Sequence, residues 1–374
     1  MTAPPDPSSL QALQQRYGER HRWLLLFTVM VGTMAAIMSS TIINVAIPDM
    51  SAHFGLGPVR AQWVSSGFMA AMTVSMLTTP WLLMRHGYRR LYAACMWLML
   101  AGGLIGGASD QFGIVLAARV AEGLAAGVVQ PIPAIIILRA FEPHEQGRAS
   151  GIFGMGVVLA PAVGPSIGGL LVDGFGWRSI FFMVVPVCLA CLWLARRYVP
   201  TSAPGGLRPG EDRTPLDWAG LVLGSAATLC LLNGLTQWRD GGLALGLPLL
   251  AGAALLIAAF ITWQHRLAAR GGAPLMRLAI FGFRRFAMGS IVAFIYGAAL
   301  FGSTYLLPVY LQSGLGLSAS HVGALLLPAG LVLAVVIAGV GRLADRQPTH
   351  VLVSTGLALL ALSFALMPTV GSAQ

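Results

Sequence analysis

The chain has 374 residues, of which 56% are hydrophobic and only 10% are charged, and its mean hydropathy is +0.77. Because a soluble globular domain carries about 25% charged residues, this composition excludes that class and indicates a polytopic membrane protein. The net charge of +10 does not indicate nucleic-acid binding, since that function needs a basic face on a soluble fold and here the arginines lie mostly between apolar segments.

Eleven apolar segments are predicted to be membrane-spanning helices, since each suits the ~20 residues needed to cross the hydrocarbon core. They are residues 23–47, 62–83, 88–108, 113–138, 148–172, 178–198, 216–237, 244–264, 286–311, 321–341 and 350–370. The polar stretches between them divide the chain into four parts. These are a cytoplasmic tail (1–22) expected to end in a short interfacial helix, a six-helix bundle (23–198), linkers with an extra helix pair (199–285), and the first three helices of a second bundle (286–374).

The distribution of arginine predicts the orientation of the chain. All 23 basic residues are arginines, and nineteen of them fall in the tail or in loops on one side, while Arg60, Arg178 and Arg239 fall on the other. Since an excess of arginine marks the cytoplasmic side, the amino terminus and both linkers are expected to be cytoplasmic, in a multi-pass protein of the cell inner membrane.

Several motifs lie in or between these segments. The first span contains Thr-Ile-Ile-Asn-Val-Ala-Ile-Pro at residues 41–48, and the fourth contains Arg-Val-Ala-Glu-Gly at residues 119–123. In the fifth span, residues 160–169 read Ala-Pro-Ala-Val-Gly-Pro-Ser-Ile-Gly-Gly, where two prolines remove backbone donors and the glycines allow close helix approach. Residues 80–90 and 341–346 each follow the second span of a bundle and carry clustered arginines.

In this order the motifs resemble those of the fourteen-helix drug:proton antiporters of the major facilitator superfamily, the EmrB/QacA type. The resemblance covers residues 24–370 and implies an all-α polytopic membrane protein with the major facilitator fold. Eleven of the family's fourteen helices are expected, so the chain is expected to be truncated at its C-terminus. The resemblance also implies an antiporter motif formed by Pro161, Gly164, Pro165, Gly168 and Gly169. The two prolines predict a kinked helix, and Gly154, Gly164, Gly168 and Gly169 are expected to form one side-chain-free strip. It implies a cytoplasmic gate, which we call the gate residues, formed by Arg85, Gly87, Arg89 and Arg90 in the loop from Trp81 to Arg90 and by Arg342, Asp345 and Arg346.

Three positions depart from the family pattern. Ser39 stands where the first helix usually has an acid, Glu122 replaces a Gln in the fourth helix, and Pro348 replaces a Gly in the second gate motif. Glu122 is therefore the only acid expected near mid-membrane, and Arg119, three residues earlier, shares its helix face. Since a proton-driven antiporter needs a buried titratable group, Arg119 and Glu122 are predicted to couple proton movement. The alternative is a permanently neutralised structural pair.

Uncharged polar residues inside the spans are the candidates for a substrate cavity: Ser39, Thr41, Asn44 and Gln130. The alternative, most common for Ser and Thr, is a hydrogen bond to a neighbouring helix.

The sequence thus predicts a proton-coupled efflux transporter that exports small organic molecules or drugs across the lipid bilayer by alternating access. Two alternatives remain: a non-transporting truncated membrane protein, and an inner-membrane subunit of an envelope-spanning pump that binds a periplasmic adaptor protein. No enzyme, cofactor or metal site is predicted, because the chain has no Walker A string and its histidines lack metal-ligand spacing. The four cysteines fall within spans and are expected to pack as small apolar residues.

Overall fold

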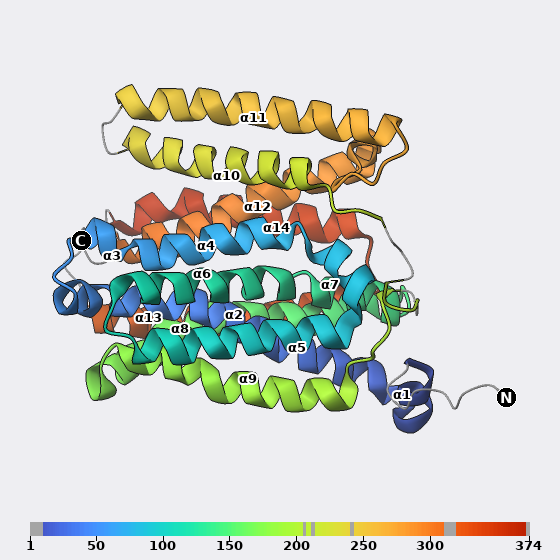
Figure 1. The fold of residues 1–374 in the computed structure, drawn as a ribbon, viewed down its shortest axis with the longest axis horizontal. Helices are drawn as coiled ribbons and strands as arrows, with labels where there is room; N and C mark the ends of the chain where they lie inside the picture. Colours follow the sequence, from blue (N-terminus) through green and yellow to red (C-terminus); the bar gives the residue numbers. More distant parts are fainter. Residues whose placement is uncertain (1–9, 205–206, 211–213, 240–242, 310–318, 372–374) are drawn as a thin grey trace.

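The computed structural model describes residues 10–204, 207–210, 214–239, 243–309 and 319–371, and within these ranges the regular structure is helical. The N-terminal helices are α1 (Leu10–Tyr17), α2 (Arg20–His53), α3 (Pro58–Ala61), α4 (Trp63–Met76), α5 (Thr79–Ala108), α6 (Phe112–Val129), α7 (Ile132–Ala140), α8 (Gln146–Phe175) and α9 (Arg178–Tyr198). They are followed by α10 (Trp218–Arg239), α11 (Leu243–Ala269), the 3-10 turn η2 (Leu278–Gly282), α12 (Arg284–Val309), α13 (Ala319–Ala344) and α14 (Thr349–Gly371). Figure 1 shows the long helices running side by side, which confirms the predicted all-helical class.

Each predicted span coincides with a helix or with two consecutive helices of this bundle. By length and composition, six segments of the described residues are apolar enough to cross a membrane: Arg20–His53, Thr79–Ala108, Phe112–Ala140, Arg178–Tyr198, Trp218–Trp238 and Ala244–Ala269. The count of eleven spans stays a prediction.

Two predicted spans are interrupted. The span predicted at 62–83 is divided at Leu77 and Thr78, where α4 ends and α5 begins. The fourth span is divided after Gln130, because Pro131 lacks the N–H that would continue α6. The prediction of a loop from Trp81 to Arg90 is wrong, because this stretch lies inside α5. Only Gly87 leaves helical geometry there.

Helix α8 packs between α2 and α13, and glycines form both contacts. Toward α2, a Cβ atom on Gly164 would lie 2.8 Å from Thr41 Oγ1. Toward α13, a Cβ on Gly151 would lie 2.8 Å from the Cα of Gly341, so the two backbones touch. The expectation of a single strip was wrong, because Gly169 has no neighbour within 4 Å while Gly164 and Gly168 face α2.

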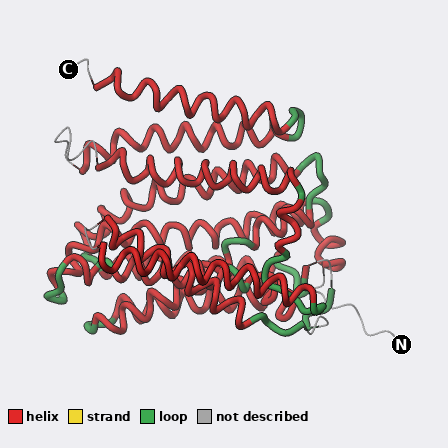
Figure 2. The backbone as a smooth tube through the Cα atoms, turned by 90° about the horizontal axis from the view of Figure 1, so that it is seen from above, coloured by secondary structure: helices red, strands yellow, loops and turns green. Residues whose placement is uncertain are grey.

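The prolines of the antiporter motif lie within α8, which is continuous from Gln146 to Phe175. Pro161 is half-buried, and the side chain of Pro165 lies outside the described part of the structure. The first three helices of the predicted second bundle correspond to α12, α13 and α14. Figure 2 shows α14, which leads to the C-terminus, at the edge of the bundle.

The extra pair, α10 and α11, forms a separate layer along one side of the bundle (Figure 1). Asp217 joins the two helices: it accepts the Gly220 backbone N–H at the start of α10 (2.8 Å), Trp263 Nε1 (2.8 Å) and Gln264 Nε2 (2.6 Å) from α11. Gln264 in turn accepts the Met276 backbone N–H at 3.2 Å. The Asp217 carboxylate is therefore a helix cap and a helix-to-helix contact.

Candidate functional site

The centre of the site is a buried ion pair on α6. Arg119 Nη1 donates to Glu122 Oε2 at 2.5 Å, and the two residues are 2% and 0% exposed. Their spacing of three residues places both side chains on one face of the helix, as the sequence predicts. Removing two charges from water is costly, so a buried ion pair needs further hydrogen bonds to its charged groups to offset that cost.

Three other groups hold Arg119 in place. Ser39 on α2 accepts Nη1 through its hydroxyl (2.7 Å) and Nη2 through its backbone carbonyl (3.0 Å). The Val64 carbonyl accepts Nε at 3.5 Å, and the guanidinium carbon lies 4.3 Å from the centre of the Phe68 ring on α4. Arg119 therefore joins α2, α4 and α6, and the ring face adds a cation–π attraction.

The two oxygens of Glu122 differ. Oε2 accepts Arg119 and also the Ser39 hydroxyl at 3.3 Å, whereas Oε1 is buried with no hydrogen-bond partner in the described residues. Oε1 faces α5, where a Cβ atom on Gly103 would lie 3.7 Å away, and Gly102 leaves room for the Glu122 stem. A buried acceptor without a partner is rare in proteins. This oxygen is the one atom of the cluster that can take a proton without displacing an existing bond.

A small cavity of about 180 Å³ borders Ser39, the residue that contacts the ion pair. It lies between α2 and α9 and is lined by apolar side chains that include Met34, Met38 and Met183, with Ser39 as its polar residue. Methionine adapts its shape easily, so this wall suits apolar groups of varied shape.

The other predicted cavity residues are not gathered around the ion pair. Half-buried Thr41 donates to carbonyls of its own helix, Ile37 (3.3 Å) and Met38 (3.2 Å), and not to a neighbouring helix as the predicted alternative has it. Asn44 is exposed on α2, and Gln130 is half-buried at the break between α6 and α7. Ser39 is thus the one member of this set that contacts Glu122.

The first group of gate residues contacts the linker that follows α9. Gly87 has φ +74°, a conformation that favours glycine, and a Cβ atom there would lie 2.9 Å from Pro209 Cγ. Arg89 donates through its backbone N–H to the Pro200 carbonyl (3.1 Å) and through Nε to the Val199 carbonyl (2.7 Å). Arg85 lies over the Trp81 ring at 5.4 Å and, like Arg90, is exposed.

The second group joins the end of α13 to the start of α8. Asp345 Oδ1 accepts the Gly147 backbone N–H at 2.8 Å, and Oδ2 accepts that of Arg148 at 2.9 Å. These N–H groups belong to the first turn of α8, where a negative charge is favoured by the helix dipole. Arg342 and Arg346 are exposed beside this contact.

Sequence reasoning missed three parts of the site. The sequence marks Phe68 only as an apolar residue, and the Val64 carbonyl carries no sequence signal. Nothing in the sequence predicts that the residues directly after α9 bond to α5. A spacing rule locates Phe68, since Val64 and Phe68 lie four residues apart on one face of α4. No pattern in the sequence indicates which helix face α6 meets.

A family model described as "Major Facilitator Superfamily" matches residues 29–373. The chain belongs to this superfamily. Among curated members, it is 29% identical over 338 residues to the uncharacterized MFS-type transporter YhcA of Bacillus subtilis, covering 89% of this chain and 61% of that protein.

Two similar superfamily members are named for drug export. The multidrug resistance protein B homolog of Mycobacterium tuberculosis is 30% identical over 357 residues, which cover 93% of this chain and 64% of the homolog. The multidrug export protein EmrB of Haemophilus influenzae is 27% identical over 347 residues, covering 91% and 66%. The chain therefore spans less than two thirds of the length of each of these relatives.

A solved structure of the same superfamily shares the fold. The proton:xylose symporter XylE superposes with a TM-score of 0.58 at 12% identity, covering 86% of this chain and 68% of XylE. Together with the family match, this shows that the described part of the chain has the fold of membrane proteins of the major facilitator superfamily. No group of three His, Cys, Asp or Glu that could hold a metal lies among the described residues.

Proposed function

We propose that this protein is a proton-coupled exporter of small organic molecules, with Glu122 as the group that carries the driving proton. One observation supports this most: Glu122 is 0% exposed, is paired through one oxygen only, and contacts Ser39, which lines a cavity between α2 and α9. Intramembrane ionisable residues are rare, and they commonly mark ion or substrate paths. The names of the drug-exporting relatives support the substrate class.

The mechanism follows from the contacts of Arg119. In the unprotonated state Glu122 pairs with Arg119, and in the protonated state Arg119 keeps only Ser39, Val64 and Phe68 as partners. The two states therefore differ in whether the Arg119 charge is balanced within α6, while the bonds of Arg119 to Ser39 on α2 remain. A cationic substrate that reaches Ser39 competes with Arg119 for the carboxylate, which ties substrate entry to proton release. The alternative is that Arg119 and Glu122 form a purely structural ion pair.

The test of function is transport in reconstituted vesicles, using the protein as expressed from its own gene. An imposed pH gradient is expected to drive accumulation of a fluorescent lipophilic cation, and a protonophore is expected to abolish it. Accumulation that survives the protonophore would exclude proton coupling. Absence of any transport would favour the non-transporting alternative, and co-purification of a periplasmic adaptor would favour the pump-subunit alternative.

We further propose that the amino terminus and both linkers are cytoplasmic, in the inner membrane, with the four-part division predicted from the sequence. Ser202→Cys and Ala273→Cys should react with a membrane-impermeant maleimide only after permeabilisation, because both lie on the arginine-rich side. Arg60→Cys, on the other side, should react in intact cells. Three native cysteines are buried, and Cys230→Ser removes the half-buried fourth. Labelling of Ser202→Cys in intact cells at the Arg60→Cys rate contradicts this orientation.

The contact of Asp345 with α8 is proposed to hold the gate closed on that side. Asp345→Asn removes the charge and one of two acceptors, so we expect a loss of about 1–2 kcal/mol in the closed state. Transport rate should change several-fold while substrate affinity stays constant, measured in vesicles and by equilibrium binding. Asp49→Asn, an exposed acid on α2, is the matched control. An unchanged rate for Asp345→Asn overturns the gate assignment.

A further inference from the structure

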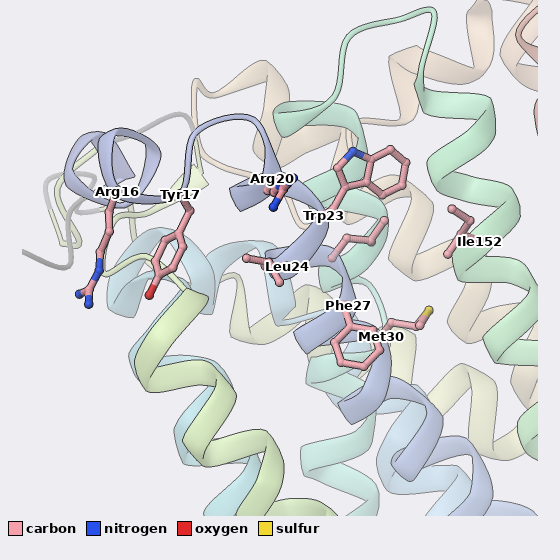
Figure 3. A pocket seen from close by; sticks show the side chains of 9 residues that line it. Arg16, Tyr17, Arg20, Trp23, Leu24, Phe27, Met30 and Ile152 are labelled. Carbon is pink, nitrogen blue, oxygen red and sulfur yellow. The ribbon is translucent and has the colours of Figure 1, made fainter.

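A second cavity lies at the N-terminal end of the bundle, far along α2 from the ion pair. Its volume is about 730 Å³, and it is open to the surface between α1, α2 and α8. Figure 3 shows its side chains: Arg16 and Tyr17 lie at one end, Arg20 lies between Tyr17 and Trp23, and Phe27, Met30 and Ile152 lie at the other end. Nothing in the proposed transport mechanism uses it.

The polar end of this cavity carries two arginines with no acidic partner among the described residues. Arg16 and Arg20 are both exposed. The nearby acids Glu19 and Glu145 both pair with Arg22. Arg22 Nη2 lies 3.5 Å from Glu19 Oε2, and Arg22 Nη1 lies 2.6 Å from Glu145 Oε2. This end therefore presents net positive charge toward solvent or headgroups.

The walls at this end are held in place. Tyr17, at the end of α1, packs edge-on against Tyr198 at 5.4 Å and stacks on His21 at 6.4 Å. His21 Nε2 donates to the Tyr198 carbonyl at 2.9 Å, which ties the start of α2 to the end of α9. On the α8 side, the Arg148 guanidinium lies 5.2 Å from the Trp23 ring. The cavity is thus a built feature of the fold.

The apolar end has the length of one membrane leaflet. Met30 follows Arg20 by ten residues of continuous helix, which at 1.5 Å per residue is ~15 Å. Half of the ~30 Å hydrocarbon core is also ~15 Å. Phe27 is 50% exposed in this stretch, so its ring faces the groove and not the protein core. Tyr17 and Trp23 lie at the boundary, where amphipathic rings are favoured.

We propose that this cavity binds one anionic phospholipid of the adjacent leaflet, with its charged headgroup beside Arg16 and Arg20 and an acyl chain along Leu24, Phe27 and Met30. Charge selects the headgroup, because basic residues near a membrane surface attract anionic lipids. The apolar length selects a lipid over a free phosphate ion. This assignment does not depend on proton coupling through Glu122.

Native mass spectrometry of the detergent-purified protein tests this, with phosphatidylglycerol and phosphatidylcholine of identical acyl chains as probes. We expect phosphatidylglycerol to be retained on the order of ten-fold more than phosphatidylcholine. The double variant Arg16→Gln/Arg20→Gln should reduce the retention of phosphatidylglycerol to that of phosphatidylcholine. The control Arg266→Gln/Arg270→Gln removes two exposed arginines at the same spacing and should leave retention unchanged.

Two further arms locate the lipid and keep the test decisive. Phosphatidylglycerol with brominated acyl chains should quench tryptophan fluorescence less in Trp23→Phe than in wild type. If Arg16→Gln/Arg20→Gln does not fold, Ile152→Trp, which narrows the acyl groove, should lower retention instead. Equal retention of the two lipids overturns the proposal. So does inorganic phosphate protecting against thermal unfolding as well as phosphatidylglycerol, because the site would then bind a free anion.

Discussion

Glu122→Gln should abolish export driven by a pH gradient. The substitution keeps the size of the side chain and its ability to accept a bond from Arg119, but it removes the titratable group that is 0% exposed. Accumulation of substrate in reconstituted vesicles should fall to the level seen without a gradient. Substrate binding should change by less than about 1.4 kcal/mol, a factor of ten, because the cavity wall is almost entirely apolar and Gln keeps an acceptor oxygen beside Ser39.

Two variants accompany this one. Glu142→Gln replaces an exposed acid and should transport normally. Ser39→Asp, added to Glu122→Gln, should partly rescue coupling, because the Ser39 hydroxyl already lies 2.7 Å from Arg119 Nη1. If Glu122→Gln still concentrates substrate at unchanged proton stoichiometry, Glu122 is only a structural partner of Arg119.

Arg119→Gln should be the most destabilising substitution in the first bundle. It leaves the Glu122 carboxylate buried without its cation and removes the guanidinium contacts with Ser39 and Phe68. Removing one partner of a buried pair costs about 3–5 kcal/mol. A loss of that size lowers the unfolding temperature on the order of 10 °C, as measured in detergent by tryptophan fluorescence.

The double variant separates charge from packing. Arg119→Gln/Glu122→Gln has no buried charge, so it should recover most of the stability lost in Arg119→Gln. If the double variant is no more stable than Arg119→Gln, the loss comes from packing against Phe68 and the pair is not electrostatically coupled.

The sequence predicts much of the fold because membrane helices must satisfy their backbone internally, which leaves a clear apolar signal. It also predicts the Arg119 and Glu122 contact, since a three-residue spacing fixes that geometry. It does not predict which residues complete the site. Phe68 belongs to another helix, and the face it presents to α6 depends on packing between segments about fifty residues apart. The sequence also gives no sign that Asp217 accepts three N–H groups and joins α10 to α11.

The glycines of α8 also have contacts that the sequence does not predict. The motif in α8 predicts close helix approach, but its partners are two different helices, α2 at Gly164 and α13 at Gly151. A periodic pattern gives the spacing of contacts along one helix and carries no information about which neighbour each contact meets. The lipid-sized cavity beside α1 is likewise assembled from helices that only the fold brings together.

Substrate-induced proton release tests the central claim most directly. Purified protein in weakly buffered detergent receives a lipophilic cation, and a pH-sensitive dye reports the protons released per molecule bound. Wild-type protein should release protons on binding, while Glu122→Gln should bind the cation and release none. Equal release from both proteins would contradict the claim that Glu122 carries the driving proton.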